Sequence, residues 1–146
     1  MNHDDPFDLS RFLKAQEPVY ARVLSELRGG QKRTHWMRFI FPQIDGLGFS
    51  ATTKYYAIKS LTEAQHYLEH PVLAARLLEC AEAVLAVKGR SISEIFGYPD
   101  DLKLKSSMTL FACVSNSPSV FDQVLEKYFR GERDAKTLAL LEKQQT

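Results

Sequence analysis

Apolar residues recur at intervals of three and four along most of the chain, which is the spacing of one face of an α-helix. Serine followed three residues later by glutamate, at Ser60–Glu63 and Ser91–Glu94, is typical of a capping box at a helix start. Glycine and proline separate the apolar runs, as expected at helix ends. The pattern predicts helices over about 8–16, 18–28, 60–69, 71–88, 91–96, 101–114, 118–130 and 134–141.

The segment 36–58 has no clean period. Pro42, Gly46 and Gly48 interrupt any regular element there. We predict a short helix over 36–41 followed by an irregular loop, with a small extended segment within 36–58 as the alternative. The fold class is therefore mainly α, a compact irregular array of about seven to nine short helices in one domain. Residues 1–7 are predicted to be a loose end and about 8–141 the core.

Composition narrows the functional classes. The 146 residues are 45% hydrophobic and 25% charged, which fits one globular domain. A net charge of +1 provides no overall field toward nucleic acid or a membrane, so neither is an expected partner. The acidic N-terminus lacks the features of a signal peptide, and a cytoplasmic location is expected. No phosphate loop or dinucleotide fingerprint occurs, so no cofactor is expected.

His66, Glu69 and His70 match the spacing of one class of zinc peptidase. Such a site needs two imidazoles one turn apart on one helix face. Pro71 follows His70 directly, and a residue before proline is pushed out of helical geometry. We therefore expect no metal site and interpret this motif as a helix end.

Basic and aromatic residues are mixed from Lys32 to Phe41. Such mixing suits stacking on a base with cations on phosphates. The alternative is that the aromatic residues are core and the basic residues lie in solvent. We favour the core for Phe39 and Phe41 and leave Trp36 open, because a tryptophan beside a glycine-bearing loop often lines a pocket.

The segment 99–109 is rich in polar side chains. In a helix, Asp101 and Lys105 would form an i,i+4 pair on a solvated face. The alternative is an anion site in which Lys105, Ser106 and Ser107 hold a phosphate or carboxylate.

Four motifs together resemble the bacterial family known as domain of unknown function 1810. They span 35–48, 70–73, 94–101 and 105–111. The resemblance covers about Asp8 to Leu141 and implies a compact, mainly helical domain. It implies no particular activity.

A more distant likeness is to the NADAR family, which is tied to ADP-ribose and NAD-related metabolism. It rests on a tyrosine-rich segment over 55–59, on Arg76 at the end of an Ala-Ala-Arg run, and on Lys105 and Met108. This resemblance implies a ligand of the ADP-ribose or NAD type.

Two hypotheses follow. In the first, the protein hydrolyses an N-glycosidic bond of such a ligand, and Asp101 or Asp45 stabilises the oxocarbenium-like transition state. In the second, the protein is a non-catalytic binding or protein-interaction module. Such a module would use the same pocket or an exposed face, and whether the protein is an enzyme stays open. The predicted ligand-binding residues of the pocket are Trp36, Gln43, Tyr56, Arg76, Lys105, Ser106 and Ser107.

Overall fold

Ten helices account for the regular structure of residues 4–144, the part of the chain that the computed structural model describes. The predicted mainly helical class is confirmed. The helices are α1 (Ser10–Gln16), α2 (Tyr20–Arg28), α3 (Met37–Ile40), α4 (Ala51–Tyr56), α5 (Leu61–Glu69), α6 (Pro71–Ala86), α7 (Ile92–Phe96), α8 (Asp100–Cys113), α9 (Val120–Phe129) and α10 (Ala135–Gln144).

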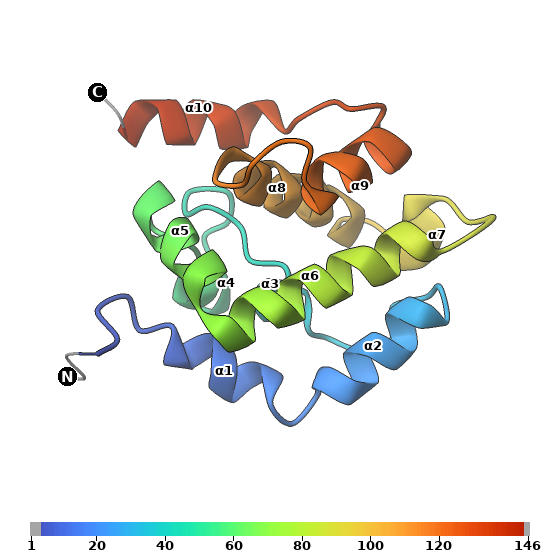
Figure 1. Ribbon diagram of the computed structural model, residues 1–146, viewed down its shortest axis with the longest axis horizontal. Helices are drawn as coiled ribbons and strands as arrows, with labels where there is room; N and C mark the ends of the chain where they lie inside the picture. Colours follow the sequence, from blue (N-terminus) through green and yellow to red (C-terminus); the bar gives the residue numbers. More distant parts are fainter. Residues whose placement is uncertain (1–3, 145–146) are drawn as a thin grey trace.

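The longest helix, α6, crosses the middle of the molecule (Figure 1). α1 and α2 lie on one side of it, and α8, α9 and α10 lie on the other. α6 packs against α1, α2, α5 and α9, while α8 packs against α7, α9 and α10. The chain between α2 and α4, which includes α3, passes behind α6 in the view of Figure 1.

Side-chain caps explain several of the helix boundaries. The Ser91–Glu94 capping box is complete, whereas at α5 only the serine half forms because the Glu63 carboxylate turns to Lys59 and Arg11 instead. Nδ1 of His70 accepts the backbone N–H groups of Val72 and Leu73 at 3.2 and 3.3 Å. His70, the second histidine of the zinc-peptidase-like motif, thus caps α6.

The segment 36–58 contains more structure than the sequence predicts. Besides α3, it holds the six-residue helix α4, which Ser50 caps by accepting the N–H of Thr53. The small extended segment that was predicted as the alternative is present as one isolated parallel bridge between Ile44 and Ile58. This bridge ties the loop before α4 to the loop after it.

Arg11 joins three parts of the chain inside the molecule. Its guanidinium is buried and donates to carbonyl oxygens of Phe7, Asp8, Tyr55 and Ala57, and to the Glu63 carboxylate at 2.7 Å. It therefore anchors the last residues of the segment that we predicted to be loose. Residues 1–3 of that segment lie outside the described residues.

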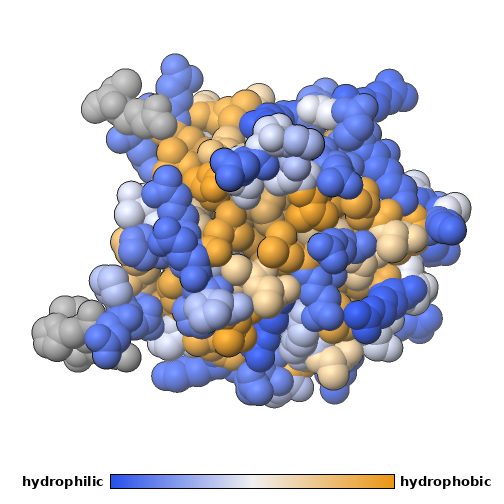
Figure 2. Space-filling view, viewed as in Figure 1, coloured by the Kyte–Doolittle hydropathy of each residue, from blue (hydrophilic) through white to orange (hydrophobic). Residues whose placement is uncertain are grey.

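Apolar side chains also reach the surface. On the face of Figure 2 they form a patch bordered by hydrophilic residues. Val72 and Leu78 on α6 are among the exposed apolar residues. Over residues 4–144, no helix is both long and apolar enough to cross a membrane.

Candidate functional site

A cavity of about 430 Å³ opens between the loop that precedes α3, helix α4 and the start of α8. Cationic and aromatic side chains dominate its wall. The described lining residues are Lys32, His35, Trp36, Met37, Arg38, Phe39, Thr52, Tyr56, Asp100 and Lys103. Three permanent cations face a single carboxylate there, so the cavity has an excess of positive charge although the whole chain is nearly neutral.

Glu26 holds the loop that forms one wall of this cavity. Its buried carboxylate on α2 accepts the backbone N–H groups of Arg33 and Thr34, the Thr34 hydroxyl and the Trp36 indole N–H, at 2.6 to 3.0 Å. Burial raises the pKa of Glu26, but these hydrogen bonds outweigh burial and bring the pKa to about 2. The carboxylate is therefore ionised at neutral pH and fixes the loop.

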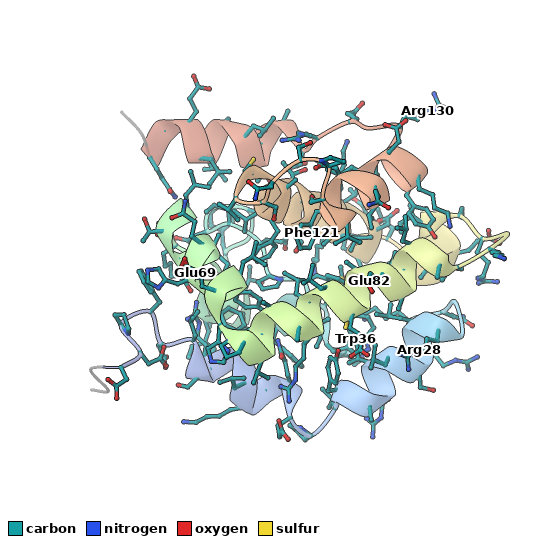
Figure 3. All side chains as sticks on the ribbon, in the orientation of Figure 1. Arg28, Trp36, Glu69, Glu82, Phe121 and Arg130 are labelled. Carbon is teal, nitrogen blue, oxygen red and sulfur yellow. The ribbon has the colours of Figure 1, made fainter. Side chains whose placement is uncertain are left out.

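Trp36 is consequently a structural wall. Only 1% of its surface is exposed, and in the view of Figure 3 it projects between the ribbons of α2 and α6. Its ring packs against Phe41 and Phe96, and the Lys32 ammonium lies 5.1 Å from the ring centroid. The indole can offer a ligand an edge, whereas its hydrogen-bond donor is already used by Glu26.

Asp100, at the start of α8, pairs with one cation from the loop before α3 and one from α8. Its carboxylate lies 2.9 Å from the Lys32 ammonium and 3.5 Å from that of Lys103. The Lys32 side chain is 8% exposed, so this ion pair is largely shielded from solvent. Lys103 keeps donor capacity toward the cavity because an ammonium has three N–H groups.

Tyr56 and Phe39 form the aromatic side of the cavity, with ring centroids 5.5 Å apart. Tyr56 is half-buried. Burial raises the pKa of its phenol, and the neighbouring Tyr55 raises this pKa further by a smaller amount. Its hydroxyl is thus protonated at neutral pH and remains a hydrogen-bond donor. Within residues 4–144 that hydroxyl has no hydrogen-bond partner.

A second cavity of about 260 Å³ adjoins the first, and the Lys103 side chain lines both. Apolar groups take a larger share of its wall, which comes from the α3–α4 loop, α4, α8 and the start of α10. The lining residues are Gln43, Leu47, Gly48, Thr53, Pro99, Leu102, Lys103, Ser106, Asp134 and Lys136. Between the two cavities, Arg38 donates to the Thr53 hydroxyl at 3.2 Å.

Four of the predicted ligand-binding residues lie at these cavities. Trp36 and Tyr56 line the first, and Gln43 and Ser106 line the second. The remaining three line neither. Arg76 pairs with Glu17 on α1's side of the molecule, and Ser107 is fully buried.

Lys105 also points away from both cavities. It pairs with Glu132 and lies 5.9 Å from the Phe129 ring centroid, on the side of α8 that faces α9. The structure therefore does not bring Trp36 and Lys105 to one cavity. The expected Asp101–Lys105 pair is wrong, because Asp101 faces inward and accepts the Ser93 hydroxyl at 3.0 Å instead.

Neither of the predicted catalytic carboxylates lines a cavity of this site. Asp101 is buried, and Asp45 lies 3.7 Å from the Lys59 ammonium near the molecular surface. The carboxylate that does line the cavity is Asp100, one residue before the predicted one. No group of three or more His, Cys, Asp or Glu suited to a metal ion occurs in the described part of the chain.

The predicted ligand-binding residues did not include the three cations that line the first cavity, Lys32, Arg38 and Lys103. The mixture of basic and aromatic residues from Lys32 to Phe41 was the signal for the first two. The spacing Asp100–Lys103 is a signal for an i,i+3 pair. The spacing Asp101–Lys105 is an equally good signal for an i,i+4 pair. Which of the two pairs forms depends on the face of α8 that turns toward the core.

This all-helical chain with a cationic–aromatic cavity belongs to the family described as protein of unknown function DUF1810, whose model matches residues 6–141. It is similar to a solved structure, the conserved hypothetical protein Rv1873 from Mycobacterium tuberculosis. The two chains are 56% identical, the match covers 94% of this chain and 99% of that one, and the TM-score is 0.93. No protein with a curated description matches significantly.

Proposed function

We propose that the protein binds an anionic nucleotide of the ADP-ribose or NAD type in the larger cavity. The observation that supports this most directly is the combination of Lys32, Arg38 and Lys103 with the aromatic residues Phe39 and Tyr56 around one 430 Å³ space. Cations suit phosphate oxygens, and aromatic faces suit a base. A cavity of this size falls in the range of small-molecule sites.

The contacts of Asp100 favour binding over catalysis. An N-glycosidic hydrolase of this kind needs a carboxylate near the anomeric carbon, and Asp100 is the carboxylate in the cavity wall. It is, however, already ion-paired with Lys32 and Lys103, and these contacts hold it against the wall. Its role in the proposal is to position the two ammonium groups for the ligand.

Isothermal titration calorimetry with AMP, ADP-ribose and inorganic phosphate tests the binding proposal. Lys103→Ala should weaken nucleotide binding by about tenfold, the usual effect of losing one charge-assisted hydrogen bond. Lys105→Ala is the matched control, because it removes the same charge from the same helix outside both cavities. Equal effects of the two substitutions, or no binding of any nucleotide, would refute the proposal.

Chromatography that measures the release of nicotinamide from NAD distinguishes catalysis from binding alone. We expect no release above the rate without protein. Release that Asp100→Asn abolishes while Asp101→Asn does not would show instead that the cavity is an active site.

A further inference from the structure

The two cavities meet at a pair of cations. Lys103 lines both of them, and Arg38 lines the first while its guanidinium donates to Thr53 in the wall of the second. A narrow depression between them is lined by Arg38, Gln43, Thr53 and Tyr56, which also belong to one cavity or the other. The two cavities and the depression between them therefore form one groove, with Arg38 and Lys103 where the cavities meet.

The second cavity differs from the first in chemistry. It lacks the aromatic wall. Beside the apolar Leu47, Pro99 and Leu102 it offers four polar side chains: the Gln43 amide, the Ser106 hydroxyl, the Asp134 carboxylate and the Lys136 ammonium. A carboxylate and an amide oxygen accept hydrogen bonds, as sugar hydroxyls require, whereas a carboxylate repels phosphate.

Two of these side chains have unused hydrogen-bonding capacity. The Gln43 amide and the exposed Lys136 ammonium make no side-chain hydrogen bond or ion pair with any residue between 4 and 144. Asp134, by contrast, already accepts the N–H and hydroxyl of Thr137 and is held in one orientation. Gln43 and Lys136 are therefore the groups that a ligand could engage without breaking an existing contact.

From this arrangement we infer that the second cavity is a subsite for a hydroxyl-rich sugar attached to the distal phosphate of the nucleotide. The inference rests on the proposed function, in which the first cavity holds the nucleotide. The diphosphate lies where the two cavities meet, between Arg38 and Lys103, and the distal sugar contacts Gln43 and Lys136. These two residues set the preference for a diphosphate that carries a second sugar over one that does not.

Calorimetric titration with ADP and ADP-ribose tests the subsite, since ADP-ribose adds the distal ribose at the terminal phosphate and carries one negative charge fewer there. The wild-type protein should bind ADP-ribose about tenfold more tightly than ADP, through one or two added hydrogen bonds. Gln43→Leu and Lys136→Ala should each weaken ADP-ribose binding by about fivefold and leave ADP binding unchanged. Lys88→Ala removes an exposed cation that lines neither cavity and should change nothing.

The outcomes are distinguishable. Equal affinity of the wild-type protein for ADP and ADP-ribose overturns the subsite while the nucleotide cavity stands. If Lys136→Ala lowers the affinity for ADP and for ADP-ribose equally, the subsite is overturned too, because Lys136 would then contact a phosphate. Binding of neither ligand overturns the proposed function together with the subsite. Circular dichroism of Gln43→Leu shows whether the variant is folded. Lys136→Ala changes an exposed position and therefore tests the subsite even if Gln43→Leu does not fold.

Discussion

Glu26→Gln is the substitution that most directly tests how the cavity wall is built. Glutamine has nearly the shape of glutamate and can keep one oxygen acceptor for Arg33, Thr34 and Trp36, all of which donate to the same carboxylate oxygen. Its amide can donate to the Thr34 hydroxyl, which donates to the other oxygen in the native protein. The substitution therefore removes the charge while it preserves the hydrogen-bond pattern, much as protonation of Glu26 would.

The magnitude follows from the pKa. Burial raises the pKa of Glu26, yet the hydrogen bonds lower it from the ordinary 4.5 to about 2. A difference of this size corresponds to about 3 kcal/mol in favour of the ionised form in the folded state. At pH 7 we expect Glu26→Gln to lower the free energy of unfolding by about 2 to 3 kcal/mol. That corresponds to a fall in Tm of about 4 to 12 °C for a chain of this length.

The sign of the pH dependence is fixed by the same values. Because the folded-state pKa is depressed, the contribution of Glu26 is complete above pH 4.5 and is lost as the pH falls toward 2. The difference between wild type and Glu26→Gln should therefore be largest at pH 7, about half as large at pH 3, and near zero at pH 2.

Urea unfolding followed by circular dichroism at these pH values measures the difference. Glu82→Gln is the matched control, an exposed glutamate on α6 for which we expect a change within about 0.5 kcal/mol. A Glu26→Gln protein as stable as wild type at pH 7, or a difference that does not shrink in acid, would refute the reasoning.

Three other substitutions test the fold and the groove. Arg11→Met leaves the buried Glu63 carboxylate unpaired and should cost about 3 to 5 kcal/mol in urea unfolding; a loss below about 1 kcal/mol would contradict this. His70→Ala removes the cap of α6 and should cost about 1 kcal/mol by the same assay, with an unchanged stability as the contrary result. Gly48→Ala places a Cβ 2.7 Å from Thr53 Cγ2, so Thr53 must shift, and calorimetry should show ADP-ribose binding weakened several-fold; unaltered affinity would argue against the groove.

Helix positions could be predicted from the chain because their signals are local. Ser91 with Glu94, and Pro71 after His70, mark boundaries through the chemistry of neighbouring residues. Helix α4 escaped prediction since its sequence, Ala-Thr-Thr-Lys-Tyr-Tyr, contains mostly β-branched and aromatic residues of modest helix propensity. Its Ser50 cap and its packing against α3 compensate.

The rotation of α8 could not be predicted, and the candidate site depends on it. Most of this helix is buried, from Leu104 and then continuously over 106–112, so polar and apolar residues alternate around it without a solvent face. Periodicity identifies a buried face only when another face is exposed. Asp100 and Asp101 were thus indistinguishable in sequence, and tertiary packing turns Asp101 inward and Asp100 toward the cavity.

The Glu26 contacts also couple stability to the proposed binding. The loop that they fix supplies Lys32 and His35 to the cavity, whereas Phe121 lies in the core on the other side of α6, as Figure 3 shows. Phe121→Leu should destabilise the fold by about 1 to 3 kcal/mol, comparable to Glu26→Gln, through imperfect packing. If the loop forms the binding wall, Glu26→Gln weakens AMP binding several-fold and Phe121→Leu leaves it unchanged under conditions where both variants are folded. Equal affinities of the two variants would place the ligand away from this loop.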